Sequence, residues 1–166
     1  MRAGTARSIV TILVLLLIAP PAVPAASEEP RLGKTQDPGR NERHELGIFA
    51  GVTTGGGDVG PSLGLDYEYR LNRRFGIGGF IELTGADFRD GVIGVPFFWH
   101  VWGDLTVLAA PGVEIESDGS STSALLRVGG EYGFEMTKGW EVVPGLYVDI
   151  GDDTVVVYGL SFALSF

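Results

Sequence analysis

The chain has 166 residues, of which 26 are glycine and none is cysteine, and its formal net charge is −9. This length suits one domain, and the lack of cysteine excludes a disulfide framework and a lipoprotein anchor. The acidic balance, without any run of basic residues, argues against nucleic-acid binding, because phosphate contacts need a clustered positive face.

The N-terminal segment predicts export. Arg2 and Arg7 precede an apolar run from Ile9 to Ile18, and the small-residue stretch PPAVPAAS follows. This three-part layout is typical of a secretory signal peptide, which we assign to residues 1–25. A transmembrane anchor is the alternative, but the run is shorter than the ~20 apolar residues of a spanning helix. Residues 26–43 are charged and carry proline, and we interpret them as a flexible periplasmic leader.

Residues 44–166 predict a barrel domain. Alternating segments are separated there by glycine, aspartate and asparagine, at a spacing that fits transmembrane strands of ~9 to 11 residues. We predict eight strands, at residues 45–53, 62–71, 75–84, 92–102, 104–114, 124–135, 141–150 and 154–166. Pro96 in the fourth strand predicts a bulge or a kink, because proline cannot donate a hydrogen bond to a ladder.

No apolar stretch after the signal approaches the length of a spanning helix, so a membrane-inserted chain must close as a barrel. The predicted fold is therefore all-β, an eight-stranded antiparallel up-and-down transmembrane β-barrel. We place both termini and the tight turns near Asn72, Gly103 and Lys138 in the periplasm. The remaining loops then face outward, at residues 54–61, 85–91, 116–123 and 151–153. Aromatic side chains at the periplasmic strand ends agree with this orientation: Tyr69, Phe75, Trp99, Trp102, Phe134, Trp140 and Phe166.

The last strand alternates large apolar with mostly small residues, which suits lipid outside and a crowded lumen inside. Its final phenylalanine resembles the C-terminal assembly signal of bacterial outer-membrane β-barrels, carried here by Tyr158, Leu160, Phe162, Leu164 and Phe166. Residues 44–166 thus resemble the small eight-stranded outer-membrane β-barrel family, which includes the transmembrane domain of outer membrane protein A. The resemblance implies a monomer in outer-membrane lipid, inserted by the barrel-assembly machinery after periplasmic chaperoning. It does not imply one activity.

Strand alternation points thirteen ionisable side chains into the lumen: Glu45, Asp66, Glu68, Arg70, Glu82, His100, Asp104, Glu114, Arg127, Glu131, Glu135, Glu141 and Asp149. A tight turn at residues 136–140 would place Glu135 opposite Glu141, Gly129 opposite Tyr147, and Arg127 opposite Asp149. Because buried charges are normally paired, we predict a lumen ion-pair network. Its members are Arg127, Asp149, Glu82, Glu114, Asp66, Glu68, Arg70 and Glu131.

These patterns favour a small integral outer-membrane protein with a structural or envelope role and a lumen closed by that network. A narrow cation-preferring pore is the alternative. A lipid A-modifying enzyme is less favoured, because His100 has no serine two residues away as the outer-membrane lipid A deacylases would show. Asp66 and Glu68 lack the loop geometry of a calcium site, so we expect no metal and no cofactor. The alternative fold, a soluble barrel of the lipocalin type, would leave the acids of the second strand exposed.

Overall fold

The computed structural model describes residues 43–85, 90–116 and 121–166. Among these residues no helix is long and apolar enough to cross a membrane. The predicted signal peptide lies outside the described residues, and so does the predicted leader except for Arg43.

Ten strand segments occur in this part of the chain, and each pairs with its neighbours in an antiparallel sense. They are β1 His44–Gly55, β2 Asp58–Arg70, β3 Phe75–Thr84, β4 Asp90–Gly94, β5 Phe97–Trp102, β6 Leu105–Glu116, β7 Thr122–Tyr132, β8 Phe134–Thr137, β9 Trp140–Ile150 and β10 Thr154–Ser165. β4 and β5 both lie between β3 and β6, and β7 and β8 both pair with β9, so each couple is one interrupted strand. The described residues therefore form eight strands.

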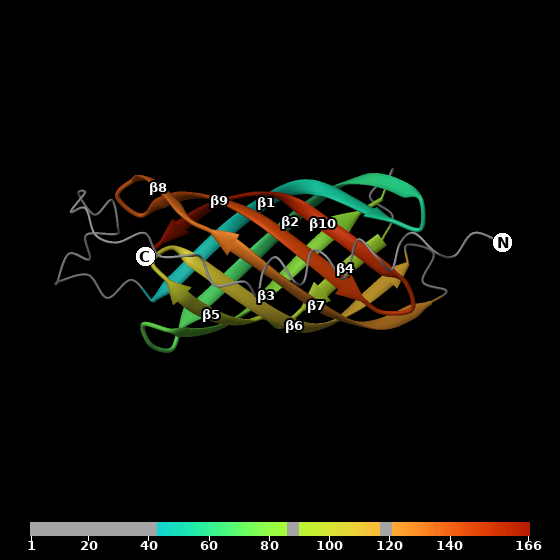
Figure 1. The fold of residues 1–166 in the computed structure, drawn as a ribbon, viewed down its shortest axis with the longest axis horizontal. Coiled ribbons are helices and arrows are strands. Elements are labelled where there is room, and N and C mark those ends of the chain that lie inside the picture. Colours follow the sequence, from blue (N-terminus) through green and yellow to red (C-terminus); the bar gives the residue numbers. More distant parts are fainter. Residues whose placement is uncertain (1–42, 86–89, 117–120) are drawn as a thin grey trace, which may run out of the picture. The chain divides into compact units, whose positions relative to one another are not determined.

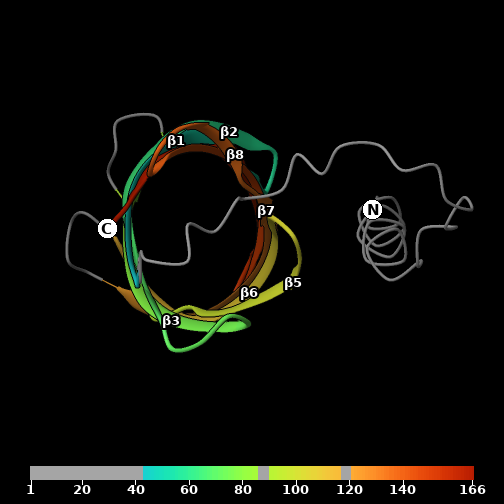
Figure 2. The same ribbon diagram turned by 90° about the vertical axis from the view of Figure 1, so that its left-hand side faces the viewer.

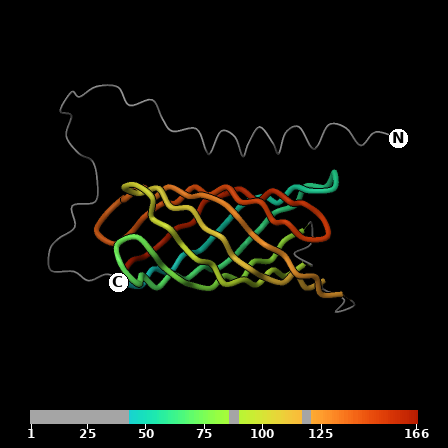
Figure 3. The backbone as a smooth tube through the Cα atoms, turned by 60° about the horizontal axis from the view of Figure 1, so that its bottom comes forward, coloured from blue at the N-terminus to red at the C-terminus, as the bar shows by residue number. Residues whose placement is uncertain are grey.

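The sheet closes on itself because β1 pairs with β2 on one side and with β10 on the other. Viewed from its end, the strands form a ring (Figure 2). They run obliquely to the long axis of the barrel (Figure 3), as closure of a sheet requires. The predicted fold, an eight-stranded antiparallel up-and-down barrel, is confirmed.

The two ends of the barrel differ. One end, here called the turn end, carries the turns at residues 71–74, 103–104 and 138–139, together with His44 and Phe166 (Figure 1, left). The opposite end, the loop end, carries the Gly56–Gly57 turn, residues 151–153, and the strand ends that flank residues 86–89 and 117–120. Both termini of the barrel thus lie with the three tight turns, as predicted.

The interruption in the fourth strand falls at the predicted place. β4 ends at Gly94 and β5 begins at Phe97, so Pro96 lies in the gap. The hydrogen-bond ladder continues across it, because Val95 N donates to Pro111 O at 3.0 Å and Gly78 N donates to Pro96 O at 3.0 Å. β6 and β9 run without a break through Pro111 and Pro144.

Two predictions were wrong in detail. The stretch 54–61 is not a loop, because β1 continues to Gly55 and β2 begins at Asp58. Gly56 and Gly57 alone make the turn, with φ of 61° and 102°, values that favour glycine. Glu135 is not enclosed in the lumen: it lies opposite Glu141, as predicted, but it is exposed in β8 at the turn end of the barrel.

Candidate functional site

Burial in this barrel is inverted relative to a water-soluble protein. Large apolar side chains are exposed on the outside of every strand in the part of the chain that the structure describes, including Phe134 and Met136 of the short β8. Polar and charged groups are buried inside: Ser62, Glu68, Glu82, Thr84, Thr106, Arg127, Glu141, Asp149, Ser161 and Ser165. The candidate site is therefore the lumen, which we describe in three layers.

Arg127 of β7 lies in the layer toward the loop end. Its Nε donates to Asp149 Oδ1 at 2.7 Å and its Nη2 to Asp149 Oδ2 at 2.8 Å. Its Nη1 donates to Glu82 Oε2 at 2.7 Å. The Arg127 residue is 4% exposed, Glu82 3% and Asp149 6%, so three charges meet almost completely buried. Such an arrangement is stable only when the charges are paired and hydrogen-bonded. Here both carboxylates bind Arg127, although the second oxygen of Glu82, Oε1, has no hydrogen-bond partner among the described residues.

Aromatic rings fill the middle layer. The Arg127 guanidinium carbon lies 4.4 Å from the ring centroid of Phe80 and 5.5 Å from that of Tyr147. Tyr147 packs edge-on against Phe49 with ring centroids 6.1 Å apart, and its hydroxyl donates to Glu131 Oε2 at 3.1 Å. A cavity of only about 50 Å³ remains among these side chains. The middle of the lumen is thus occupied by side chains.

Tyr147 covers glycine backbone, as the predicted register requires. It lies opposite Gly129, and Arg127 lies opposite Asp149. A Cβ placed on Gly129 would stand 2.4 Å from Tyr147 Cδ1, so the ring lies directly against the glycine. The predicted register between the sixth and seventh strands is confirmed, including Glu135 opposite Glu141.

The layer at the turn end holds a second group of charges. Arg70 Nη2 donates to Glu45 Oε2 at 3.0 Å, and the Ser165 hydroxyl donates to the same oxygen at 3.0 Å. His100 Nε2 lies 2.8 Å from Glu68 Oε1. All of these residues except Ser165 line the turn-end cavity, which has a volume of about 290 Å³. Its ionisable lining residues are Glu45, Glu68, Arg70, Arg73, His100, Asp104, Glu131 and Glu141.

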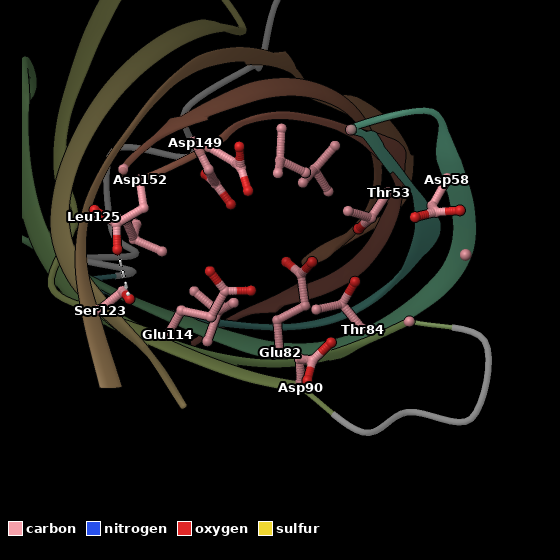
Figure 4. A pocket seen from close by; sticks show the side chains of 18 of the residues that line it. Thr53, Asp58, Glu82, Thr84, Asp90, Glu114, Ser123, Leu125, Asp149 and Asp152 are labelled. Atoms are coloured by element: carbon pink, nitrogen blue, oxygen red, sulfur yellow. Dashed lines mark hydrogen bonds between the residues drawn. The ribbon is translucent and has the colours of Figure 1, made fainter. Parts of the chain in front are cut away.

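The loop-end cavity, of about 180 Å³, is acidic (Figure 4). Seven carboxylates line it: Asp58, Glu82, Asp90, Glu114, Asp149, Asp152 and Asp153. Glu82 and Asp149 also bind Arg127, so the floor of this cavity is the Arg127 group. At the rim, the Ser123 hydroxyl donates to Asp152 Oδ2 at 3.0 Å.

The eight residues predicted as one network lie in separate groups. Arg127, Asp149 and Glu82 bond to one another, and Glu114 lines the cavity beside them. Asp66 accepts a hydrogen bond from the Ser161 hydroxyl at 3.2 Å, and Glu131 accepts from Tyr147. Arg70 and Glu68 belong to the turn-end layer, with Arg70 Nε 3.9 Å from Glu68 Oε1.

Sequence reasoning missed several partners of these charges, namely Tyr147, Ser161, Ser165 and Thr106. All four point inward from strands whose alternation was recognised, but neutral hydroxyls do not stand out in a search for charges. The turn that paired Arg127 with Asp149 has a counterpart at residues 103–104. Counting back from it would have placed His100 opposite Val107, and the β-bulge between His100 and Trp102 shifts the pairing of His100 to Thr106.

The predicted assembly-signal residues lie on β10 at the seam with β1. Leu164 pairs with Leu46, Phe162 with Ile48, Leu160 with Ala50 and Tyr158 with Val52. Phe166 follows the strand and stacks on His44 with ring centroids 5.5 Å apart. Their role in assembly stays a prediction.

Comparison with known proteins agrees on the fold. The sequence matches no protein-family model and no curated protein. A de novo designed transmembrane β-barrel superposes with a TM-score of 0.53 at 12% identity, covering 72% of this chain and 95% of the design. The attachment invasion locus protein Ail of Yersinia pestis gives a TM-score of 0.49 at 14% identity, covering 74% of this chain and 96% of Ail. The structure of Ail, an outer membrane protein, in a phospholipid nanodisc gives 0.48 at 13% identity, covering 74% and 99%.

At these identities the likeness concerns the fold alone. Together with the strand pairing, the match to the designed barrel identifies the chain as an eight-stranded transmembrane β-barrel. The more specific resemblance to the transmembrane domain of outer membrane protein A stays a prediction.

Proposed function

We propose that the chain is a small integral outer-membrane protein whose lumen is closed by side chains, with a structural role in the envelope. The main support for this proposal is the inverted burial, with apolar side chains exposed on the outside and charged side chains buried inside. An uninterrupted apolar exterior is unfavourable in water, at about 25 cal/mol per Å², and soluble monomers rarely expose apolar patches above a few hundred Å². In a bilayer the same surface faces hydrocarbon, and the closed sheet leaves its backbone groups satisfied.

The Arg127 group supports a closed lumen. It lies between the loop-end and turn-end cavities, and with Phe80, Tyr147 and Phe49 it leaves a void of only about 50 Å³. An eight-stranded barrel has an interior just wide enough for side chains to fill. Ions would have to separate Arg127 from two carboxylates to pass, which makes the resting barrel non-conducting.

The seven carboxylates of the loop-end cavity favour one alternative, a narrow cation-preferring pore. Such a lining concentrates cations at the mouth. In this alternative the Arg127 group is a gate that opens rather than a permanent closure.

Planar-bilayer recording separates the two functions. The barrel, folded in detergent and inserted from it, should give no unitary currents, whereas Arg127→Ala should give currents that favour potassium over chloride in a salt gradient. Arg43→Ala is the matched control, since Arg43 is exposed outside the lumen. Cation-selective currents from the unmodified barrel would replace the closed-lumen function with the pore.

We also propose that the apolar exterior contacts outer-membrane lipid and that the barrel inserts as a monomer through the barrel-assembly machinery after periplasmic chaperoning. Closure between β1 and β10 supports a monomer, because the seam needs no second copy. Membrane fractionation after depletion of the assembly machinery tests this: the protein should leave the outer-membrane fraction and be degraded.

A further inference from the structure

Three side chains in the wall of the turn-end cavity form a continuous hydrogen-bonded chain. Thr106 Oγ1 of β6 lies 2.9 Å from His100 Nδ1 of β5, and His100 Nε2 lies 2.8 Å from Glu68 Oε1 of β2. A carboxylate only accepts hydrogen bonds, so Nε2 carries the proton. In the neutral ring Nδ1 is then the acceptor, and the Thr106 hydroxyl donates to it. A hydroxyl, a base and a group orienting that base, all within hydrogen-bond reach, is the signature of an activated nucleophile.

The backbone around this chain is shaped to hold it. The register between β5 and β6 shifts between His100 and Trp102, so a bulge directly follows the histidine. Bulges often re-aim a side chain at an active site. On β3, a Cβ placed on Gly76 would stand 2.0 Å from Glu68 Oε1, so only glycine lets the Glu68 carboxylate lie where it meets His100.

The cavity beside these residues is a dead end rather than a passage. Its volume is about 290 Å³, Glu68, His100 and Thr106 all line it, and the Arg127 group closes the lumen further in. A space of this size admits a small molecule from the turn end. Its five carboxylates outnumber Arg70 and Arg73, which favours a neutral or cationic ligand over an anionic one.

We propose that Thr106 and His100 are the nucleophile and general base of a hydrolytic site for small neutral or cationic acyl esters, with Glu68 as the positioning residue. Thr106 Oγ1 bonds to the ester carbonyl carbon while its proton passes to His100 Nδ1. The bond from that carbon to the alcohol oxygen breaks, and the imidazolium returns the proton to the leaving alkoxide. A water molecule, deprotonated by His100 Nδ1, then bonds to the acyl carbon. The bond from that carbon to Thr106 Oγ1 breaks, His100 returns the proton to Oγ1, and the acid is released.

Two further groups fit this reaction. Glu68 keeps the ring oriented and stabilises the imidazolium through Nε2. Arg70, 3.9 Å from Glu68 Oε1 and in the same cavity lining, supplies positive charge for the oxyanion of the tetrahedral intermediate. The site goes beyond the proposed envelope role and does not depend on whether the lumen conducts.

The test uses the full chain folded in detergent, with p-nitrophenyl acetate as the probe. The unmodified barrel should release p-nitrophenol about a hundredfold faster than Thr106→Val, which keeps the side-chain shape but has no hydroxyl. Mass spectrometry after rapid acid quench should find one acetyl group on the peptide that contains Thr106. Thr84→Val is the matched control, because Thr84 is as buried as Thr106, at 6% against 5%, but lies in the loop-end cavity.

Further variants keep the proposal falsifiable if Thr106→Val fails to fold. Thr106→Ser should retain hydrolysis and His100→Gln should abolish it. Glu68→Gln and Gly76→Ala should lower kcat more than they change KM, because both act through the orientation of His100. The proposal is overturned if the unmodified barrel is no faster than Thr106→Val or His100→Gln, or if the acetyl group lies elsewhere. Unchanged kcat in Glu68→Gln would remove Glu68 from the site.

Discussion

Arg127 and Asp149 face each other across β7 and β9 and join through two parallel hydrogen bonds of 2.7 and 2.8 Å. Two parallel hydrogen bonds of this kind fix the orientation of the guanidinium plane as well as the position of its charge. Glu82 completes the group from β3, across the lumen. The pair therefore ties distant parts of the barrel wall together.

Removing the cation should destabilise the barrel strongly. Arg127→Ala leaves Glu82 and Asp149 buried without their counter-ion, and breaking a buried pair typically costs ~3 to 5 kcal/mol. Urea unfolding of the detergent-folded barrel measures this loss, and Arg43→Ala, at an exposed position, should change the free energy of unfolding little. A double-mutant cycle of Arg127→Ala with Asp149→Ala should give a coupling above ~0.5 kcal/mol. Additive effects would show that the pair is not energetically linked.

The adjacent glycines Gly129 and Gly130 of β7 should differ in how well they tolerate a methyl group. At Gly129 an added Cβ would stand 2.4 Å from Tyr147 Cδ1 and 2.5 Å from the Leu146 carbonyl oxygen. At Gly130, on the other face, the nearest atom is the Thr106 carbonyl oxygen at 3.5 Å. Gly129→Ala should lower the free energy of unfolding by about 1 to 3 kcal/mol, as overpacking does, and Gly130→Ala should be nearly neutral. Equal effects in the same urea titration would mean that Tyr147 does not lie against Gly129.

The strands and the face of each side chain could be predicted because a period of two is unambiguous in long strands. Leu63, Leu65 and Tyr67 face outward and Gly64, Asp66 and Glu68 inward, as the alternation indicates. The start of this strand was predicted at Ser62, whereas β2 begins at Asp58, because Pro61 and its neighbouring glycines resemble a loop. Pro61 is tolerated in β2 because pairing with β3 begins only at Ser62, so one side of the ladder is absent there.

In the candidate site, too, some contacts could be predicted from the sequence and others could not. Arg127 and Asp149 could be paired from the sequence because a tight turn fixes the register of the two strands that it joins. Glu68 meets His100 from a strand that is not adjacent in the sheet, so only the curvature of the closed barrel brings the two together. Contacts across the lumen depend on barrel shape, which local patterns do not specify.

Cysteine labelling tests the orientation of the barrel in the membrane. The chain has no cysteine, so each introduced thiol is unique. Asp58→Cys and Asp152→Cys lie at the loop end and Lys138→Cys at the turn end. A membrane-impermeant maleimide should label the first two on intact cells, whereas Lys138→Cys should react only after lysis. Labelling of Lys138→Cys alone on intact cells would invert the orientation.

The seam between β1 and β10 closes through His44 and Phe166. Their backbones exchange two hydrogen bonds, from His44 N to Phe166 O at 3.1 Å and from Phe166 N to His44 O at 2.8 Å, and their rings stack. An aromatic pair contributes about 0.5 to 1.5 kcal/mol beyond its buried area. Phe166→Ala should therefore unfold at a lower temperature in gel-shift assays of heated samples. Phe75→Ala is the matched control, because Phe75 begins β3 at the same end, is 48% exposed against 53% for Phe166, and lies away from the seam. An equal or larger loss from Phe75→Ala would show that the ring stack on His44 does not hold the barrel closed.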